Sequence, residues 1–246
     1  MGVSRVGMFD LSGKRVAITG AGGGIGAAAA RICAEQGAIV NLSDLTSPDA
    51  VATQLVAQGF EAAAVAVDVS DRARVESWAR ALGDVDAVID CAAICPFHDW
   101  EDDGWDLECD QVFSINLGGP INVVRAFMPG MVERNGGSIA MVGSVAGRIG
   151  GVAAAPHYVM SKGGVHSFVR WAAKRGAPHN VTVNAVAPGV VDTPMTANQS
   201  FNYDQFPMGR KATAEEMAAP LAFLISPAAT YVNGAVLDVN SGMHFS

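Results

Sequence analysis

The stretch Thr19-Gly20-Ala21-Gly22-Gly23-Gly24-Ile25-Gly26 decides the fold, because it joins two segments of different periodicity. Before it lies the short apolar run at residues 15–18, and after it comes an alanine-rich segment at residues 27–36, which Gly37 closes. This order predicts a buried strand, a tight turn and a helix that ends at a glycine cap. Such a turn lets the backbone approach a pyrophosphate and directs the free N–H groups of the helix at it.

The spacing of the glycines leaves the ligand of this turn open. The common dinucleotide pattern G-x-G-x-x-G/A fits only as Gly22, Gly24 and Ala27. The better-spaced set is Gly20, Gly24 and Gly26. At this point a glycine-rich strand-to-helix turn with no ligand remains an alternative to a dinucleotide site.

Composition favours a cytoplasmic protein with one large core. The chain has 246 residues, of which 50% are hydrophobic, and a formal net charge of −8. It contains no uninterrupted apolar run of about 18 residues and no signal-peptide pattern, so we expect no membrane partner. The negative charge and the absence of a basic cluster also argue against nucleic acid as a partner.

The cysteines at first resemble a metal cluster. Three of the four, Cys91, Cys95 and Cys109, lie near His98, while Cys33 is distant in sequence. Their spacings are not the C-x2-C type that tetrahedral zinc sites favour, and a chain of this size shows no disulfide framework. We therefore expect free thiols and no metal.

Strand and helix patterns alternate along the rest of the chain. Further strands are predicted at residues 38–44, 61–67, 86–90, 137–144, 181–186 and 235–239, and helices at 48–58, 72–82, 111–128, 156–176 and 215–225. This alternation predicts an α/β fold: one domain over residues 1–246 with a Rossmann-type, doubly wound parallel sheet of about seven strands. Asp71 is the expected N-cap of its helix. The pattern of residues 95–110 gives no clear element, and residues 195–210 are predicted to be a mobile cover over the strand ends.

Asp44 ends the second predicted strand about twenty residues after the glycine turn, where a carboxylate can bind both hydroxyls of an adenosine ribose. A 2′-phosphate there would meet like charge, and no lysine or arginine follows closely to neutralise it. This favours NAD over NADP, although Asp44 as a simple cap of the next turn is the alternative. Asp68, at the next strand end, could meet an adenine amino group.

Tyr158 and Lys162 lie four residues apart on one predicted helix, so their side chains share a face. A free tyrosine titrates near pH 10, and an adjacent ammonium favours the phenolate. A tyrosine tuned in this way is a general acid/base for an alcohol or ketone oxygen. Ser144, at a strand end, could give that oxygen a second hydrogen bond. A surface tyrosine beside a solvated lysine is the alternative.

Pro120 interrupts the helix predicted at residues 111–128. Proline lacks an N–H, so it leaves the carbonyl of Asn116 without its helical donor. A freed carbonyl usually accompanies a kink and recruits water.

Together these residues resemble the short-chain dehydrogenases/reductases. The turn at residues 19–26 is similar to the family's T-G-x-x-x-G-x-G, and Ser144 with Tyr158-Val-Met-Ser-Lys162 is similar to its serine and Y-x-x-x-K. Asn116 resembles the fourth catalytic position, and residues 184–189 resemble the strand before the nicotinamide loop. The match runs from about Leu11 to Gly242, with every element in family order.

The resemblance implies a catalytic role for each of four residues. Tyr158 transfers the proton, and Ser144 steadies the substrate oxygen. Lys162 lowers the tyrosine pKa and holds the nicotinamide ribose. Asn116 holds a relay water through its backbone carbonyl, a site that we expect Pro120 to strengthen.

The resemblance also implies the cofactor contacts, and a homotetramer built partly on the helices near residues 111–130 and 156–175. The expected cofactor-binding residues are Gly20, Gly24, Ile25, Gly26, Asp44, Asp68, Val69, Cys91, Ala92, Ala93, Tyr158, Lys162, Pro188, Gly189, Val191 and Thr193. Two segments depart from the family. Asp90-Cys91-Ala92-Ala93 replaces N-N-A-G, and the C-terminal glycine pair reads Asn240-Ser241-Gly242.

We therefore expect an NAD-dependent oxidoreductase that interconverts a secondary alcohol and its ketone. The expected pocket walls are mainly apolar, which favours a hydrophobic substrate. They are Cys95, Phe97, Val145, Val152, His157, Val190, Met195, Phe201 and Tyr203. Two alternatives remain: an NADPH-dependent reductase of a 3-oxoacyl thioester, which Asp44 opposes, and a non-catalytic NAD-binding scaffold.

Overall fold

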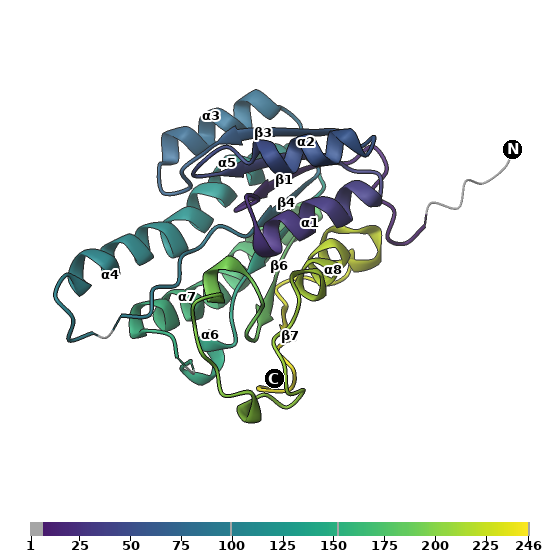
Figure 1. Ribbon diagram of the computed structural model, residues 1–246. Coiled ribbons are helices and arrows are strands. Elements are labelled where there is room, and N and C mark those ends of the chain that lie inside the picture. The colour runs from purple at the N-terminus through teal and green to yellow at the C-terminus, as the bar shows by residue number, and fades with distance from the viewer. Residues whose placement is uncertain (1–6, 99, 152, 246) are drawn as a thin grey trace, which may run out of the picture.

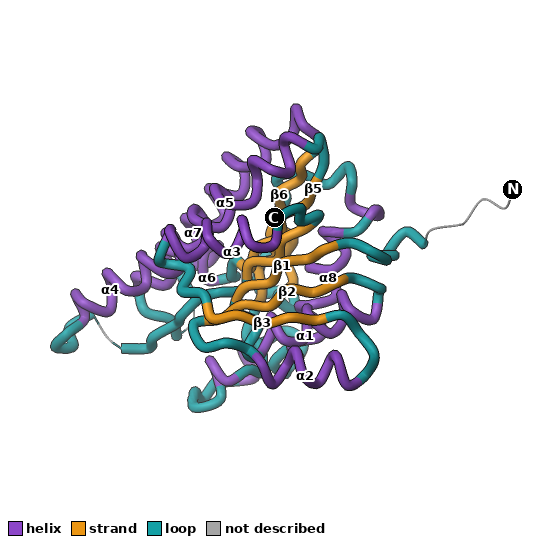
Figure 2. The backbone as a smooth tube through the Cα atoms, turned by 90° about the horizontal axis from the view of Figure 1, so that it is seen from above, coloured by secondary structure: helices purple, strands orange, loops and turns teal. Residues whose placement is uncertain are grey.

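The computed structural model describes residues 7–98, 100–151 and 153–245. All seven strands belong to one parallel sheet in the order β3-β2-β1-β4-β5-β6-β7 (Figure 2). They are β1 (Arg15–Thr19), β2 (Ile39–Asp44), β3 (Ala62–Ala66), β4 (Ala87–Asp90), β5 (Gly137–Val142), β6 (Val181–Pro188) and β7 (Val236–Val239). The predicted Rossmann-type, doubly wound sheet is confirmed.

Helices cover both faces of this sheet. They are α1 (Gly24–Glu35), α2 (Asp49–Ala57), α3 (Arg72–Leu82), α4 (Trp105–Phe113), α5 (Gly119–Glu133), α6 (Ala146–Ile149), α7 (Pro156–Gly176) and α8 (Ala214–Ile225). Figure 2 shows α1, α2 and α8 on one face and α3, α5 and α7 on the other. Each face encloses its own apolar core, and alanines of α1 such as Ala29 and Ala30 allow close packing there.

Most element boundaries agree with the sequence patterns. The helix predicted at residues 72–82 is α3, and Asp71 caps it by accepting the amides of Ala73 and Arg74. α1 begins at Gly24, three residues earlier than predicted. α4 begins within residues 95–110, the segment whose pattern gave no clear element. In Figure 1 this helix extends outward from the sheet.

The predicted helix at residues 111–128 is interrupted. α4 and α5 are separated by a single π-helical turn, Ser114–Gly118, in which the amide of Gly119 reaches back to the carbonyls of Ser114 and Ile115. Pro120 follows directly, and its missing N–H explains why the regular hydrogen-bond ladder cannot continue across this point. The expected interruption is confirmed.

The chain order of the strands locates a binding site. β2 lies on one side of β1 and β4 on the other, so the strand order reverses between β1 and β4. In open parallel sheets, ligands bind beyond the carboxyl ends of the strands at such a point. None of the helices in the described ranges is long and apolar enough to span a membrane.

Candidate active site

The glycine turn after β1 is built from close backbone contacts. Gly20 has a φ of +62°, and a Cβ there would lie 2.7 Å from the carbonyl carbon of Cys91. A Cβ on Gly26 would lie 2.1 Å from the carbonyl oxygen of Gly20. α1 then begins at Gly24 with no side-chain cap on its first amides. The turn therefore presents bare backbone N–H groups to the space beyond the strands.

Asp44 lies at the end of β2 beside this turn. Its Oδ2 accepts the amide of Gly22 at 2.8 Å, and its Oδ1 accepts the amide of Leu45 at 2.7 Å. These bonds fix the carboxylate at the cavity wall. Among the described residues that line this cavity, Lys162 is the only lysine or arginine.

Asp90 ends β4 as a buried carboxyl. Thr19 donates its hydroxyl to Asp90 Oδ1 at 2.5 Å and accepts the amide of Ala92 at 3.2 Å. This bridge joins β1 and β4 at the point where the strand order reverses. Burial raises the pKa of Asp90, while Thr19 and the charge of Lys162 act in the opposite direction.

Ser144, Tyr158 and Lys162 line the same cavity. Burial raises the pKa of Tyr158 above its ordinary value, the charge of Cys95 adds to this, and the hydrogen bond with Ser144 offsets part of it. The sequence predicts that the pKa of Tyr158 is lowered, and this prediction is wrong when only the groups of this chain act on the phenol. The physical reason is that desolvation of the phenolate outweighs the favourable contacts.

Lys162 is held at a fixed position beside Tyr158. Its Nζ donates to the carbonyl of Val142 at 2.8 Å and lies 5.7 Å from the centre of the Tyr158 ring. Burial lowers the pKa of Lys162 to about 8, although the charge of Asp90 opposes this shift. Near that pH, Lys162 is only partly charged, which limits its effect on the phenol.

Asn116 is buried and does not line the cavity. Its side chain accepts the amide of Ile94 at 2.9 Å, donates to the carbonyl of Ile94 at 2.9 Å and donates to Ser161 Oγ at 3.1 Å. Ser161 in turn donates to the carbonyl of Tyr158 at 2.8 Å. The side chain of Asn116 thus connects the segment after β4 to the helix turn that carries Tyr158.

The cavity has a volume of about 880 Å³ and is lined by the glycine turn, the strand ends and the segment at residues 193–201. All sixteen residues expected to contact the cofactor line it. Six of the expected substrate-pocket residues also line it: Cys95, Phe97, Val145, Val190, Met195 and Phe201. From residues 195–210, which we predict to be a mobile cover over the strand ends, Met195 and Phe201 line the cavity.

Two expected pocket residues lie elsewhere. His157 is fully buried with Nε2 3.0 Å from a carboxylate oxygen of Glu108, so it faces α4 and not the cavity. Tyr203 packs edge-on against Phe206 and lines a separate hollow near Arg210. Both predictions were wrong because neighbouring residues on a helix or an irregular segment point in different directions. Val152 lies outside the described residues.

The sequence patterns missed several cavity residues. Asp110, Gln111 and Ser114 line it from α4 and the π turn, and Met243 lines it from the C-terminal segment. The first three are exposed, so they form the polar rim of an otherwise apolar region. The separation of Asp110 and Ser114 by four residues could have indicated that they share one face of a helix, but the segment before them gave no helical pattern.

The four cysteines are free thiols, and burial raises the pKa of Cys95 to about 12.

Comparison with known proteins identifies the family. A family model described as enoyl-(acyl carrier protein) reductase matches residues 20–244. L-rhamnose 1-dehydrogenase (NAD(P)(+)) from Sphingomonas sp. strain SKA58 is 36% identical over 250 residues, covering 95% of this chain and 97% of the relative.

Solved structures agree over nearly the whole chain. A candidate NAD(P)-dependent gluconate 5-dehydrogenase from Beutenbergia cavernae, with NADP bound at low occupancy, has a TM-score of 0.91 and 33% identity, covering 96% of this chain and 99% of the other. A 3-oxoacyl-(acyl-carrier protein) reductase from Brucella melitensis with bound NAD has a TM-score of 0.89 and 31% identity, covering 100% and 99%. The chain belongs to the short-chain dehydrogenase/reductase family and is an oxidoreductase of that family.

Proposed function

We propose that the protein is an NAD-dependent oxidoreductase that interconverts a hydrophobic secondary alcohol and its ketone. One observation carries the proposal: Ser144, Tyr158 and Lys162 line the same cavity as the glycine turn and Asp44. A proton-transfer group and a dinucleotide cradle in one cavity are what hydride transfer between a cofactor and an alcohol requires.

The residues present fit a nicotinamide dinucleotide. Gly22, Gly23 and Gly24 line the cavity at the start of α1, so a pyrophosphate there would lie against the first amides of this helix. Asp44 would accept the ribose hydroxyls, and its charge would repel a 2′-phosphate. The relatives support a nicotinamide cofactor without choosing between its two forms, since one is named for NAD(P) and the two structures contain NADP and NAD.

Each functional group of the chain has its own role in the proposed reaction. Nicotinamide, when bound, supplies the hydride acceptor or donor. Tyr158 takes the hydroxyl proton during oxidation and returns it during reduction, while Ser144 holds the same oxygen. Lys162 would hold the ribose, and the backbone carbonyl of Asn116 would hold a relay water toward solvent. The Ser161 and Asn116 bonds orient the turn of α7 that carries Tyr158.

The apolar walls support the substrate class. Phe97, Val145, Val190 and Phe201 line the same cavity as Tyr158, and Met243 adds to them. A second candidate, a polyhydroxy substrate, is favoured by the polar rim of Asp110, Gln111 and Ser114. One relative is named L-rhamnose 1-dehydrogenase, and this name also supports a polyhydroxy substrate.

The proposed assembly is a cytoplasmic homotetramer. Trp171 and Met160 on α7 are 56% and 63% exposed, and Ile121 on α5 is 43% exposed. Apolar side chains of this size on two long helices favour burial against another copy of the chain. Sedimentation analysis tests the stoichiometry.

Fluorescence titration with NADH and NADPH tests the cofactor. We expect NADH to bind at least about tenfold more tightly, and Asp44→Ala to reduce that preference several-fold, because both the ribose contact and the repulsion are removed. Asp49→Ala, at an exposed position of α2 that does not line the cavity, is the matched control and should behave as the wild type. Tighter binding of NADPH by the wild type would overturn the assignment and favour the 3-oxoacyl thioester reductase.

An activity screen tests the substrate class. Hydrophobic secondary alcohols and polyols of similar size are compared with NAD at pH 8 to 9. Higher kcat/KM for the apolar set supports the proposal, whereas a preference for polyols supports the rim of Asp110 and Gln111 as the recognition site. Cofactor binding without turnover of any alcohol, ketone or thioester would favour the scaffold alternative.

A further inference from the structure

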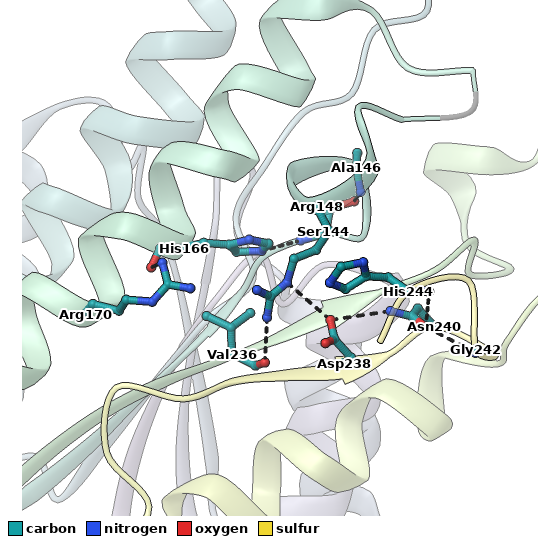
Figure 3. A network of polar contacts seen from close by, with 10 residues as sticks. All are labelled: Ser144, Ala146, Arg148, His166, Arg170, Val236, Asp238, Asn240, Gly242 and His244. Atoms are coloured by element: carbon teal, nitrogen blue, oxygen red, sulfur yellow. Dashed lines mark hydrogen bonds and ion pairs between the residues drawn. The ribbon is translucent and has the colours of Figure 1, made fainter. Parts of the chain in front are cut away.

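His166 is a buried histidine one helical turn after Lys162 on α7. Tyr158, Lys162 and His166 are spaced by four residues, so they follow one another along one face of the helix. His166 is only 3% exposed, and it does not line the cavity. Figure 3 shows it pointing from α7 toward Ser144.

Three consecutive amides at the end of β5 define what this ring does. Gly143 donates its amide to the carbonyl of Val186 at 2.8 Å, and Val145 donates to the carbonyl of Pro188 at 2.7 Å. The amide between them, on Ser144, donates to His166 Nε2 at 3.3 Å. The sheet thus holds the residues on either side of Ser144, and a side chain holds Ser144 itself.

Gly143 provides the space for this contact. A Cβ at residue 143 would lie 2.4 Å from His166 Nε2 and 3.0 Å from the carbonyl oxygen of Val186. No side chain at this position is compatible with both the ring and the strand. The glycine and the histidine therefore form one arrangement around the backbone of Ser144.

The charges around the ring favour its neutral form. Burial is the main reason that the pKa of His166 is lowered to about 4. Three cations face it, Arg148 from α6 and Lys162 and Arg170 from α7, and Asp238 on β7 partly opposes them. Arg148 Nε lies 3.4 Å from Asp238 Oδ1, and its guanidinium also donates to the carbonyl of Val236 at 3.0 Å (Figure 3). A neutral ring can keep Nε2 free of a proton and able to accept.

We propose that His166 is a positioning residue: through neutral Nε2 it accepts the Ser144 amide and fixes the Ser144 hydroxyl opposite Tyr158. A local hydrogen bond also holds the hydroxyl of Ser144, because its Oγ accepts the amide of Ala146 at 3.0 Å. With its backbone held by His166 and its Oγ held by Ala146, Ser144 has little freedom to turn away. The inference rests on the proposed role of Ser144 in binding the substrate oxygen.

The first test needs no substrate. Nitrogen NMR of the protein labelled with ¹⁵N-histidine reports the tautomer and charge of each ring. We expect the His166 ring to be neutral, with its proton on Nδ1, throughout the pH range 5 to 8. A proton on Nε2, or a cationic ring at pH 6, would overturn the proposal whether or not the protein is a dehydrogenase.

The second test separates positioning from packing. His166→Leu keeps an apolar side chain but removes the acceptor, while His166→Gln restores an acceptor of similar reach. We expect the leucine variant to lose about two- to tenfold in kcat on the best alcohol of the screen, the size of one neutral hydrogen bond, with NADH affinity unchanged. The glutamine variant should recover most of this loss.

His179→Leu, at an exposed histidine after α7, is the control and should leave kcat unchanged. Equal losses in the leucine and glutamine variants, accompanied by equal falls in melting temperature, would show a packing role and overturn the proposal. If the leucine variant does not fold, the tautomer measured in the wild type still decides between the two.

Discussion

The two ends of the cavity are built in different ways. At the end beside β1 the walls are backbone: the glycine turn, the amides of α1 and the ends of β2 and β4. Away from the glycine turn they are side chains carried by α4, by residues 195–201 and by Met243. Backbone walls depend on a few glycines with no tolerance for a Cβ, whereas side-chain walls can be exchanged without disturbing the sheet.

Because the two parts of the cavity are built differently, different substitutions should reduce turnover, folding stability and substrate binding separately. The largest effect is expected from Tyr158→Phe, which removes the proton-transfer group between the two ends. We expect kcat to fall about 10³-fold, within the range for general acid–base catalysis, while NADH affinity is retained. Steady-state kinetics and fluorescence titration measure the two quantities. Tyr231→Phe, at a fully exposed position, is the control; unchanged turnover in Tyr158→Phe would refute the mechanism.

The backbone end should be the more fragile in folding. In Gly26→Ala the new Cβ would lie 2.1 Å from the carbonyl oxygen of Gly20, so α1 or the turn must move. We expect a loss of about 3 kcal/mol in the free energy of unfolding, measured by urea denaturation. Gly23→Ala meets only Pro194, at 4.0 Å, and should lose less than about 1 kcal/mol. Similar losses in the two variants would contradict the cradle geometry.

The side-chain end should affect substrate binding alone. Phe201→Ala removes an aromatic wall of the cavity, and we expect kcat/KM for an apolar alcohol to fall about tenfold with cofactor affinity unchanged. Tyr203→Ala is the matched control, because Tyr203 packs on the same Phe206 but lies outside the cavity. A larger loss in Tyr203→Ala would show that the segment acts through its packing and not through direct contact.

The smallest effect is expected from Asp90→Asn, and it should be a gain. Because burial raises the pKa of Asp90 above its ordinary value, the native state holds that proton more tightly than the unfolded chain does. The wild type therefore loses stability as pH rises above about 4, and asparagine, which does not titrate, avoids this loss.

Asparagine can still accept the Thr19 hydroxyl. We expect the melting temperature at pH 7 to rise by about 3 °C, with the difference disappearing near pH 4. Scanning calorimetry of both proteins at several pH values measures this difference. A variant that is less stable than the wild type at pH 7 would show that the charge of Asp90, which faces Lys162, stabilises the fold.

The backbone end was predictable because its signals are local. The glycine spacing of residues 19–26, the cap at Asp71 and the four-residue step from Tyr158 to Lys162 each reflect one turn or one helix. α4 was missed for a physical reason: Leu107 is 78% exposed, so the segment lacks the buried apolar stripe that marks a helix in sequence.

The remaining errors concern tertiary environment. Whether Phe201 or Tyr203 faces the cavity depends on how both pack around Phe206, which no periodicity encodes. The direction of the Tyr158 pKa shift depends on the depth of burial, and the contact of His166 with Ser144 joins two residues that are 22 positions apart in the chain.

The π turn at Ser114–Gly118 has a consequence for how this enzyme can diverge. It accommodates more residues per turn than an α-helix, so a lineage that deleted one residue there could relax it into regular helix. Because the wider turn absorbs one extra residue, that change would leave the rotation of α4 relative to α5 nearly unaltered, and Gln111 would stay at the cavity rim. The turn is therefore the point at which this stretch can lose one residue without displacing the side chains that α4 presents to the cavity.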